Sequence, residues 1–318
     1  MKDLLHKLFR PFVPVGRAFN RFFQWLLDQR TASRILKFLV RFAAALTCFV
    51  LVFLVGYILF KGVPHLSPSL FAWEYTSENV SLTPALINTI LMILLALLVS
   101  LPLGIGAAIY LTEYTGRGNK LVSLIRITAE TLSGIPSIVY GLFGMLFFVT
   151  ALKLKLSLIS GALTLSIMVL PTILRTTEEA LLAVPESYRE GSFGLGAGRL
   201  RTVWKIVLPS ALPGIFAGVI LAMGRIVGES AALIYTAGTV AKVPDSLFSS
   251  TRTLAVHMYA LSSEGLYIDQ TYATAVVLLV LLSPVFLALA IAIKLDSPGP
   301  IFFSQIRVGQ RGHLFKIY

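Results

Sequence analysis

Ionisable residues inside long apolar runs are the part of this sequence whose types and spacing could do chemistry. Arg225 and Glu229 lie four positions apart in such a run, which predicts that they share one face of a helix. At a rise of about 1.5 Å per residue, Arg225 lies roughly 25 Å along a helix that begins near Leu208. Arg126 and Glu130 repeat the same spacing in an earlier run.

Two interpretations of these charges are open. The planar guanidinium of arginine can hydrogen-bond an oxyanion such as phosphate through two N–H groups, and nearby glutamates would prevent tight capture. The charges would then line a substrate pathway through a membrane, and Arg175, at the end of a further apolar run, would belong to it. The alternative is a structural ion pair within each helix, which satisfies buried charge without contacting substrate.

The segment 190–209 reads EGSFGLGAGRLRTVWKIVLP and interrupts the apolar runs. Pro185 breaks the helical pattern before it, and the GLGAG run predicts a tight turn, because glycine adopts positive φ without steric cost. The segment therefore predicts a short helix–turn–helix in which Tyr188, Phe193 and Leu195 are apolar anchors for a partner protein. A solvated connector is the alternative.

A membrane scaffold must position these residues. The chain has 318 residues, of which 56% are hydrophobic and 13% are charged. Apolar runs of about 20 residues are long enough to cross a bilayer, so the sequence predicts an all-α integral membrane fold with six transmembrane helices. The runs lie at about residues 39–60, 84–111, 125–152, 156–174, 208–235 and 271–294.

The net charge of +12 first suggests a nucleic-acid partner. Lys and Arg, however, concentrate in alternate loops, and only the short turn 151–157 departs weakly from this pattern. Cytoplasmic loops are enriched in these residues, so both termini are expected in the cytoplasm, and loop 175–207 becomes the largest internal cytoplasmic loop. The basic arm 1–34 is expected either as a helix on an anionic membrane surface or as a disordered arm. It has no pattern of a cleaved signal peptide.

Other common chemistries find no support in the sequence. Cys48 is the single cysteine, so no disulfide within the chain is expected. The four histidines are scattered without metal-ligand spacing, and the phosphate-cradling ATP loop is absent. No catalytic residue, metal site or cofactor bound by this chain is expected.

The segment 190–209 also resembles the EAA loop of ABC-transporter permeases in the complete spacing of its motif. In that family the loop docks into a cleft of the ATP-hydrolysing subunit, which uses ATP and Mg. This chain departs from the motif at Gly191 and Ser192, where alanines are usual; both residues are small, although the helix is expected to be less stable. The residues that carry the resemblance are Glu190, Gly191, Ser192, Gly196, Ile206, Leu208 and Pro209.

The wider context, in segments 129–144, 170–215 and 224–238, resembles the phosphate-specific permeases of bacterial ABC importers over roughly residues 40–282. The resemblance implies a permease subunit of an ATP-driven phosphate importer in the bacterial cytoplasmic (inner) membrane, not an enzyme. It also implies four kinds of partner: a second permease, two ATP-binding subunits, an external phosphate-binding protein and membrane lipid, with no nucleic acid. A permease for another oxyanion or nutrient is the alternative.

Glycines and a proline punctuate the third run. They can open the helix or permit close packing, and close packing is the expectation. These residues are Gly134, Pro136, Gly141 and Gly144.

The C-terminal tail, from about Leu281, resembles the start of bacterial polyprenyl-phosphate sugar phosphotransferases. The acidic catalytic residues of that family lie beyond where this chain stops, so a fragment of such a transferase is a weaker alternative for the function. Residues 300–318 predict two strands around a glycine-containing turn. The sixth run is expected to cross the membrane with a kink at Pro284. The predicted division is a basic arm 1–34, a transmembrane domain 35–294 and a transferase-like tail 295–318.

Overall fold

The computed structural model describes residues 29–115, 119–296, 305–308 and 314–317. The chain divides into two compact units, residues 1–60 and 61–318. Most of the predicted basic arm lies outside the described residues. The predicted domain boundaries stay predictions; helix α3 (Gln29–Gly62) runs across residue 34.

Helix α3 makes up the described part of the first unit. Large apolar side chains are exposed along its length, among them Phe49, Phe53 and Phe60. Such a predominantly apolar surface is stable against lipid or other protein but not against water. The helix predicted over the first apolar run is therefore confirmed.

The second unit contains a helical bundle with its connections. It begins with two 3₁₀ turns, η2 (Val63–His65) and η3 (Pro68–Phe71). The helices are α4 (Thr83–Ile109), α5 (Lys120–Ser133), α6 (Ser137–Gly144), α7 (Leu158–Ala183), α8 (Glu186–Gly194), α9 (Arg199–Thr202), α10 (Leu208–Val227), α11 (Ala231–Thr236), α12 (Leu254–Glu264) and α13 (Ile268–Asp296). Three π-helical segments extend them: η4 (Tyr110–Tyr114), η5 (Met145–Ala151) and η6 (Val203–Val207).

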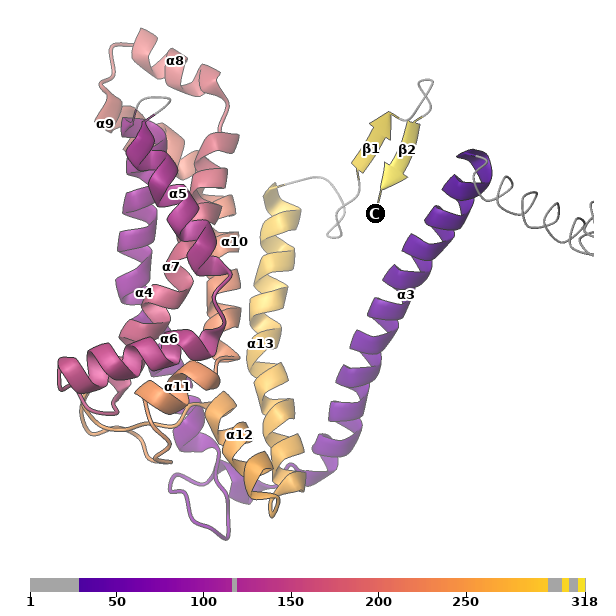
Figure 1. Cartoon of the computed structure of the whole chain (residues 1–318), viewed down its shortest axis with the longest axis vertical. Helices are drawn as coiled ribbons and strands as arrows, with labels where there is room; N and C mark the ends of the chain where they lie inside the picture. The colour runs from indigo at the N-terminus through magenta and orange to yellow at the C-terminus, as the bar shows by residue number, and fades with distance from the viewer. Residues whose placement is uncertain (1–28, 116–118, 297–304, 309–313, 318) are drawn as a thin grey trace, which may run out of the picture. The chain divides into compact units, whose positions relative to one another are not determined.

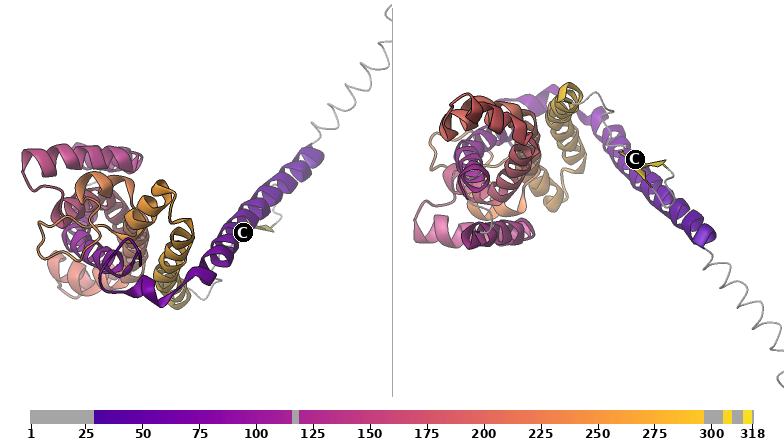
Figure 2. Two further views of the ribbon diagram at one scale, coloured as in Figure 1. Left: turned by 90° about the horizontal axis from the view of Figure 1, so that it is seen from below. Right: turned by 90° about the horizontal axis from the view of Figure 1, so that it is seen from above.

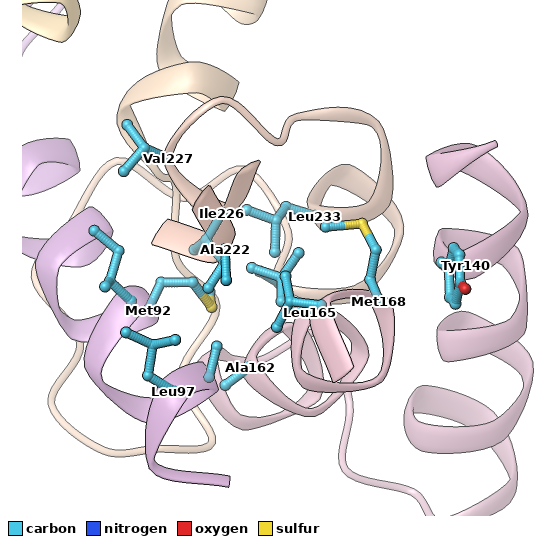
Figure 3. Close-up of a cluster of buried hydrophobic side chains, with 14 of the residues drawn as sticks. Met92, Leu97, Tyr140, Ala162, Leu165, Met168, Ala222, Ile226, Val227 and Leu233 are labelled. Atoms are coloured by element: carbon cyan, nitrogen blue, oxygen red, sulfur yellow. The ribbon is translucent and has the colours of Figure 1, made fainter. Parts of the chain in front are cut away.

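Helices α4, α7 and α10 form the centre of this bundle, with α8 across one end and α11 and α12 at the other (Figure 1). Both end-on views in Figure 2 show α6 running along the outside. Met92, Leu165 and Ile226, one from each central helix, are almost fully buried in the main apolar cluster (Figure 3). This packing sets the ends of α4, α7 and α10 in fixed positions.

The third apolar run is not one straight helix. Its two parts, Val122–Ser133 and Ser137–Ala151, bend by 103° at the break between them. Pro136 stands at this break and precedes α6, where the lack of an N–H and its fixed φ favour a new helix start. The predicted third span over residues 125–152 is therefore a bent pair of helices, and its crossing of the membrane as one span stays a prediction.

Close packing of glycines in this run is confirmed at two positions. A Cβ added to Gly141 would lie 2.8 Å from the Cα of Ala232 in α11, and one added to Gly144 would overlap Thr164 and Thr236. The absence of a side chain thus lets α6 approach α7 and α11 closely. By contrast, a Cβ at Gly134 would meet only the Thr131 carbonyl, at 3.5 Å.

Several other boundaries differ from the predicted ones. Helix α7 is continuous to Ala183, nine residues beyond the predicted end at 174. Helix α10 ends at Val227, so the predicted run 208–235 is divided between α10 and α11. Of the described helices, four are long and apolar enough to cross a membrane, or five if the bent pair is counted as one span.

The end of the chain has the predicted local structures. Helix α13 continues through Pro284 without ending there. Strands β1 (Gln305–Val308) and β2 (Leu314–Ile317) pair antiparallel, with Ile306 opposite Lys316. The predicted hairpin is confirmed, whereas the direction in which α13 crosses the membrane and its status as a sixth span stay predictions.

Candidate functional site

The segment between α7 and α10 forms the predicted helix–turn–helix. Pro185 precedes α8 and ends the continuity with α7. After α8 the chain turns at Gly196, which has φ of +80°, and the Gly196 N–H donates to the Phe193 carbonyl at 2.9 Å. A glycine in the left-handed region just past a helix is a common helix terminator. Helix α9 then continues through η6 into α10, which confirms the predicted resumption of a helix.

Helix α8 and its turn present apolar side chains to the outside. Tyr188, Phe193 and Leu195 are 51%, 44% and 91% exposed. Leu200 and Trp204, on the following helix, are exposed as well. Exposed aromatic and aliphatic side chains around a short helix are suited to insertion into the groove of a partner.

The seven residues of the EAA-like motif have different environments. Glu190 and Gly191 are exposed, and Pro209 is exposed in the first turn of α10. Ser192 is buried, and its hydroxyl hydrogen-bonds that of Thr202 over 2.8 Å, which joins α8 to α9. The remaining members are half-buried Ile206 and Leu208 and exposed Gly196.

Gly191 and Ser192 stand where alanines are usual in the motif, and the structure treats them differently. A Cβ at Gly191 would meet no atom within 4 Å, so the packing of this chain does not require glycine there. The hydroxyl of Ser192, by contrast, makes a buried hydrogen bond that alanine could not make.

Arg189 is a residue whose role the sequence did not reveal. It is buried in α8 and forms an ion pair with Glu113 in η4, at 2.7 Å between Nη2 and Oε1. The hydrogen bond with Glu113 raises the pKa of Arg189 above its usual value, although burial opposes the shift. The residues lie 76 positions apart, so no local sequence signal pairs them.

The alternative interpretation for the third run, an ion pair between Arg126 and Glu130, is not found. Arg126 in α5 instead pairs with Glu178 in α7, whose side chain is only 11% exposed. Glu130 is exposed one turn further along α5. The i, i+4 spacing offered a partner on the same helix. The buried carboxylate of Glu178 on a neighbouring helix needs a cation more than an exposed carboxylate does, because water does not solvate its charge.

Arg225 and Glu229 do not share a helix. Gly228 ends α10, and the buried Glu229 lies in the link to α11, where its Oε1 accepts from the Ala232 N–H at 3.0 Å. Glu229 thus satisfies a free N–H at the start of α11. The prediction of one helical face is wrong, because the helix stops between the two residues.

Arg175 does form an ion pair within its helix. Its Nε donates to Glu179 Oε1 at 3.1 Å, and both side chains are more than 60% exposed. The residue lies within α7 rather than at its end. Such an exposed pair contributes little stability.

A cavity of about 970 Å³ brings part of the predicted pathway next to the helix–turn–helix. Arg126 and Glu130 line it together with Glu186, Arg189 and Phe193. Lys120 and Arg199 add positive charge to a lining that is otherwise mixed in sign. The lining does not include the predicted pathway residues Arg175, Arg225 and Glu229. Within the described parts of the chain, no group of three metal-ligating side chains is found.

Long apolar helices, a charged cavity and a short helix with exposed apolar side chains at one end are features of a membrane-embedded transport subunit. Residues 100–295 match the family model described as binding-protein-dependent transport system inner membrane component. The chain belongs to this family. It is accordingly a multi-pass protein of the bacterial inner membrane and the permease component of a transporter, not an enzyme.

Individual relatives agree with this assignment. The probable ABC transporter permease protein YqgI of Bacillus subtilis is 36% identical over 244 residues, which cover 71% of this chain and 82% of that protein. The phosphate transport system permease protein PstA of Pasteurella multocida is 39% identical over 179 residues, 56% of this chain and 63% of that protein.

A solved structure shares the fold. The structure of a bacterial alginate ABC transporter in complex with a pentasaccharide-bound periplasmic protein contains a chain that aligns with a TM-score of 0.57 and 14% identity. The alignment covers 84% of this chain and 98% of that chain.

Proposed function

We propose that this chain is the membrane subunit of an ATP-driven phosphate importer, in which it forms part of the translocation pathway and is moved by an ATPase subunit. The observation that carries the proposal is α8, a short helix with exposed apolar side chains and the EAA-like spacing, at one end of a membrane bundle. A helix in this position is suited to transmit motion, because it joins α7 to α10 covalently.

The proposed complex contains a second, related permease, two ATP-binding subunits that use ATP and Mg, and an external phosphate-binding protein. Both termini and α8 lie in the cytoplasm in this arrangement, as the distribution of Lys and Arg favours. This chain itself binds no cofactor. The family's dependence on a binding protein and the membership of relatives in ABC transporters support these partners.

Phosphate as the substrate is supported by relatives named as phosphate permeases. It is also consistent with the arginines of the membrane domain, since guanidinium groups bind phosphate oxygens through paired N–H groups. We assign Arg225, half-buried near the end of α10, to the pathway together with Glu229 and the cavity residues Arg126 and Glu130. Arg175, exposed on α7, completes the proposed set.

Reconstitution tests the proposal. The chain is co-expressed with the second permease and the ATPase subunits, and the complex is placed in liposomes with ATP inside and the phosphate-binding protein outside. We expect uptake of radiolabelled phosphate that requires both ATP and the binding protein, and no uptake of sulfate or molybdate. Uptake of another oxyanion with its own binding protein, but not of phosphate, would refute the substrate assignment. Failure of the ATPase subunits to copurify would refute the permease role.

A further inference from the structure

Helix α8, the helix proposed to dock the ATPase, is attached to the bundle by very few buried side chains. Of its nine residues only Arg189 and Ser192 are buried. Ser192 connects α8 forward, to Thr202 of α9 and so to α10. Arg189 connects it to α4 and α7, so the two side chains attach α8 to different helices of the bundle.

Every N–H group of the Arg189 side chain has an acceptor. Nε donates to both carboxylate oxygens of Glu113 at 3.3 Å, and Nη2 donates to Glu113 Oε1 at 2.7 Å. Nη2 also donates to the Leu181 carbonyl at 2.9 Å, and Nη1 donates to the Val184 carbonyl at 2.9 Å. The second N–H of Nη1 reaches Glu186 at 3.3 Å. A planar guanidinium with all five donors engaged holds a single orientation.

These acceptors belong to the ends of two long helices. Glu113 lies in η4, the continuation of α4, and Leu181 and Val184 lie at the C-terminal end of α7. Carbonyls in the last turn of a helix lack partners within the helix, so a cation is favoured there. Arg189 therefore ties α8 to α4 and α7 at once.

Burial makes this connection stiff. The side chains of Arg189 and Glu113 are 11% and 9% exposed. They lie beside an apolar cluster that includes Ile109, Leu181 and Val184. Separation would leave both charges poorly solvated, so the pair resists separation when α8 is displaced.

We propose that Arg189 and Glu113 are a positioning pair that makes the ends of α4 and α7 follow α8 when the ATPase moves it. This inference rests on the proposed function, because it presumes that an ATPase docks on α8. Without the pair, α8 would still dock and would still pull α10 through Ser192, but α4 would follow only through its apolar packing against α7. ATP hydrolysis would then proceed without productive opening and closing of the pathway.

The test uses the complete importer in liposomes and measures phosphate transported per ATP hydrolysed. The variants are Arg189→Met, which removes the donors, Arg189→Lys, which keeps charge without the planar fork, and Glu113→Gln. Lys37→Met is the control, because Lys37 is an exposed basic residue of α3 and lies outside the proposed docking segment. A charge-exchanged double variant, Arg189→Glu with Glu113→Arg, tests whether the pairing itself matters.

We expect Arg189→Met and Glu113→Gln to retain the ATPase subunits and ATP hydrolysis, while phosphate transported per ATP falls about ten-fold. Arg189→Lys should lie between these variants and the wild type, the exchanged pair should recover part of the ratio, and Lys37→Met should match the wild type. If Arg189→Met cannot be purified, Arg189→Lys and Glu113→Gln decide the outcome.

An unchanged ratio in the purified variants would overturn the inference. Loss of the ATPase subunits from the variant complexes would overturn it as well, since Arg189 would then serve docking alone. The wild-type complex distinguishes these results from failure of the proposed function, which would appear as absent phosphate uptake or absent ATPase subunits in the unmodified protein.

Discussion

Replacement of Gly196, in the turn that follows α8, should impair the coupling of ATP hydrolysis to phosphate uptake. Side chains of two sizes distinguish backbone strain from a clash with the docked ATPase. Gly196 has φ of +80°, and a Cβ added there would meet no atom within 4 Å. In the isolated chain the cost of any side chain is therefore backbone strain alone. In the assembled importer, a bulky side chain would also occupy space beside the exposed Leu195 and Phe193, where the ATPase is proposed to dock.

The expected loss of stability follows from the positive φ of Gly196 and the open space around it. An L-residue in the left-handed region costs about 1–2 kcal/mol, and loss of glycine recovers about 0.4–1 kcal/mol by restricting the unfolded chain. The net loss of stability should be about 1 kcal/mol for both Gly196→Ala and Gly196→Leu. Gly265 is a matched control, because it has φ of +71° and no atom within 4 Å of an added Cβ, but it follows α12 at the other end of the bundle.

The assay has two parts. Thermal unfolding of the purified chain should show similar losses for alanine and leucine at both glycines. Copurification of the ATPase subunits and ATP-dependent phosphate uptake should then be impaired by Gly196→Leu far more than by Gly196→Ala or Gly265→Leu. Transport by Gly196→Leu equal to that of Gly265→Leu would refute the docking role of this turn.

Three further predictions concern other parts of the chain. Arg225→Gln should lower phosphate uptake at normal membrane insertion, whereas Arg17→Gln, in the basic arm, should leave uptake unchanged; normal uptake by the first variant would make Arg225 dispensable to transport. Burial, with the nearby Arg252 charge, lowers the pKa of His257 to about 4, so the unfolded chain binds a proton more readily below about pH 6.5. The free energy of unfolding should therefore fall by about 3 kcal/mol between about pH 6.5 and about pH 4. Thermal unfolding of His257→Gln should depend less on pH than that of the wild type, and identical pH profiles would contradict this role of His257. Gln310→Cys in a Cys48→Ala background should not react with a membrane-impermeant thiol reagent in intact cells, because the tail is expected in the cytoplasm. Labelling would place the tail outside.

Local features of the chain could be predicted from the sequence because their causes are local. An apolar run near residues 84–111 must be helical in a membrane, whatever it packs against, since its backbone has no water to bind. The turn at Gly196 and the break at Pro185 follow from the backbone limits of glycine and proline. The EAA-like motif could be found from the sequence for the same reason, because its residues are defined by their positions along one short segment.

The sequence also indicated where charges would matter, but not which charges would meet. Four-residue spacing offered an ion pair within the helix as one interpretation for Arg126 and for Arg225, and neither pair is found. Arg126 pairs with Glu178 on another helix, and α10 ends before Glu229. Helix ends and partners depend on the neighbouring helices, which a periodic pattern along one segment does not contain.

Sequence alone thus determined the apolar helices and the helix–turn–helix between two of them, because lipid and backbone sterics act on each segment separately. Only the tertiary structure decided the close approach at Gly141 and the joining of α8 to α4 through Arg189 and Glu113. Each of these requires residues far apart in the chain to lie within a few ångströms, and that proximity arises only when the helices pack.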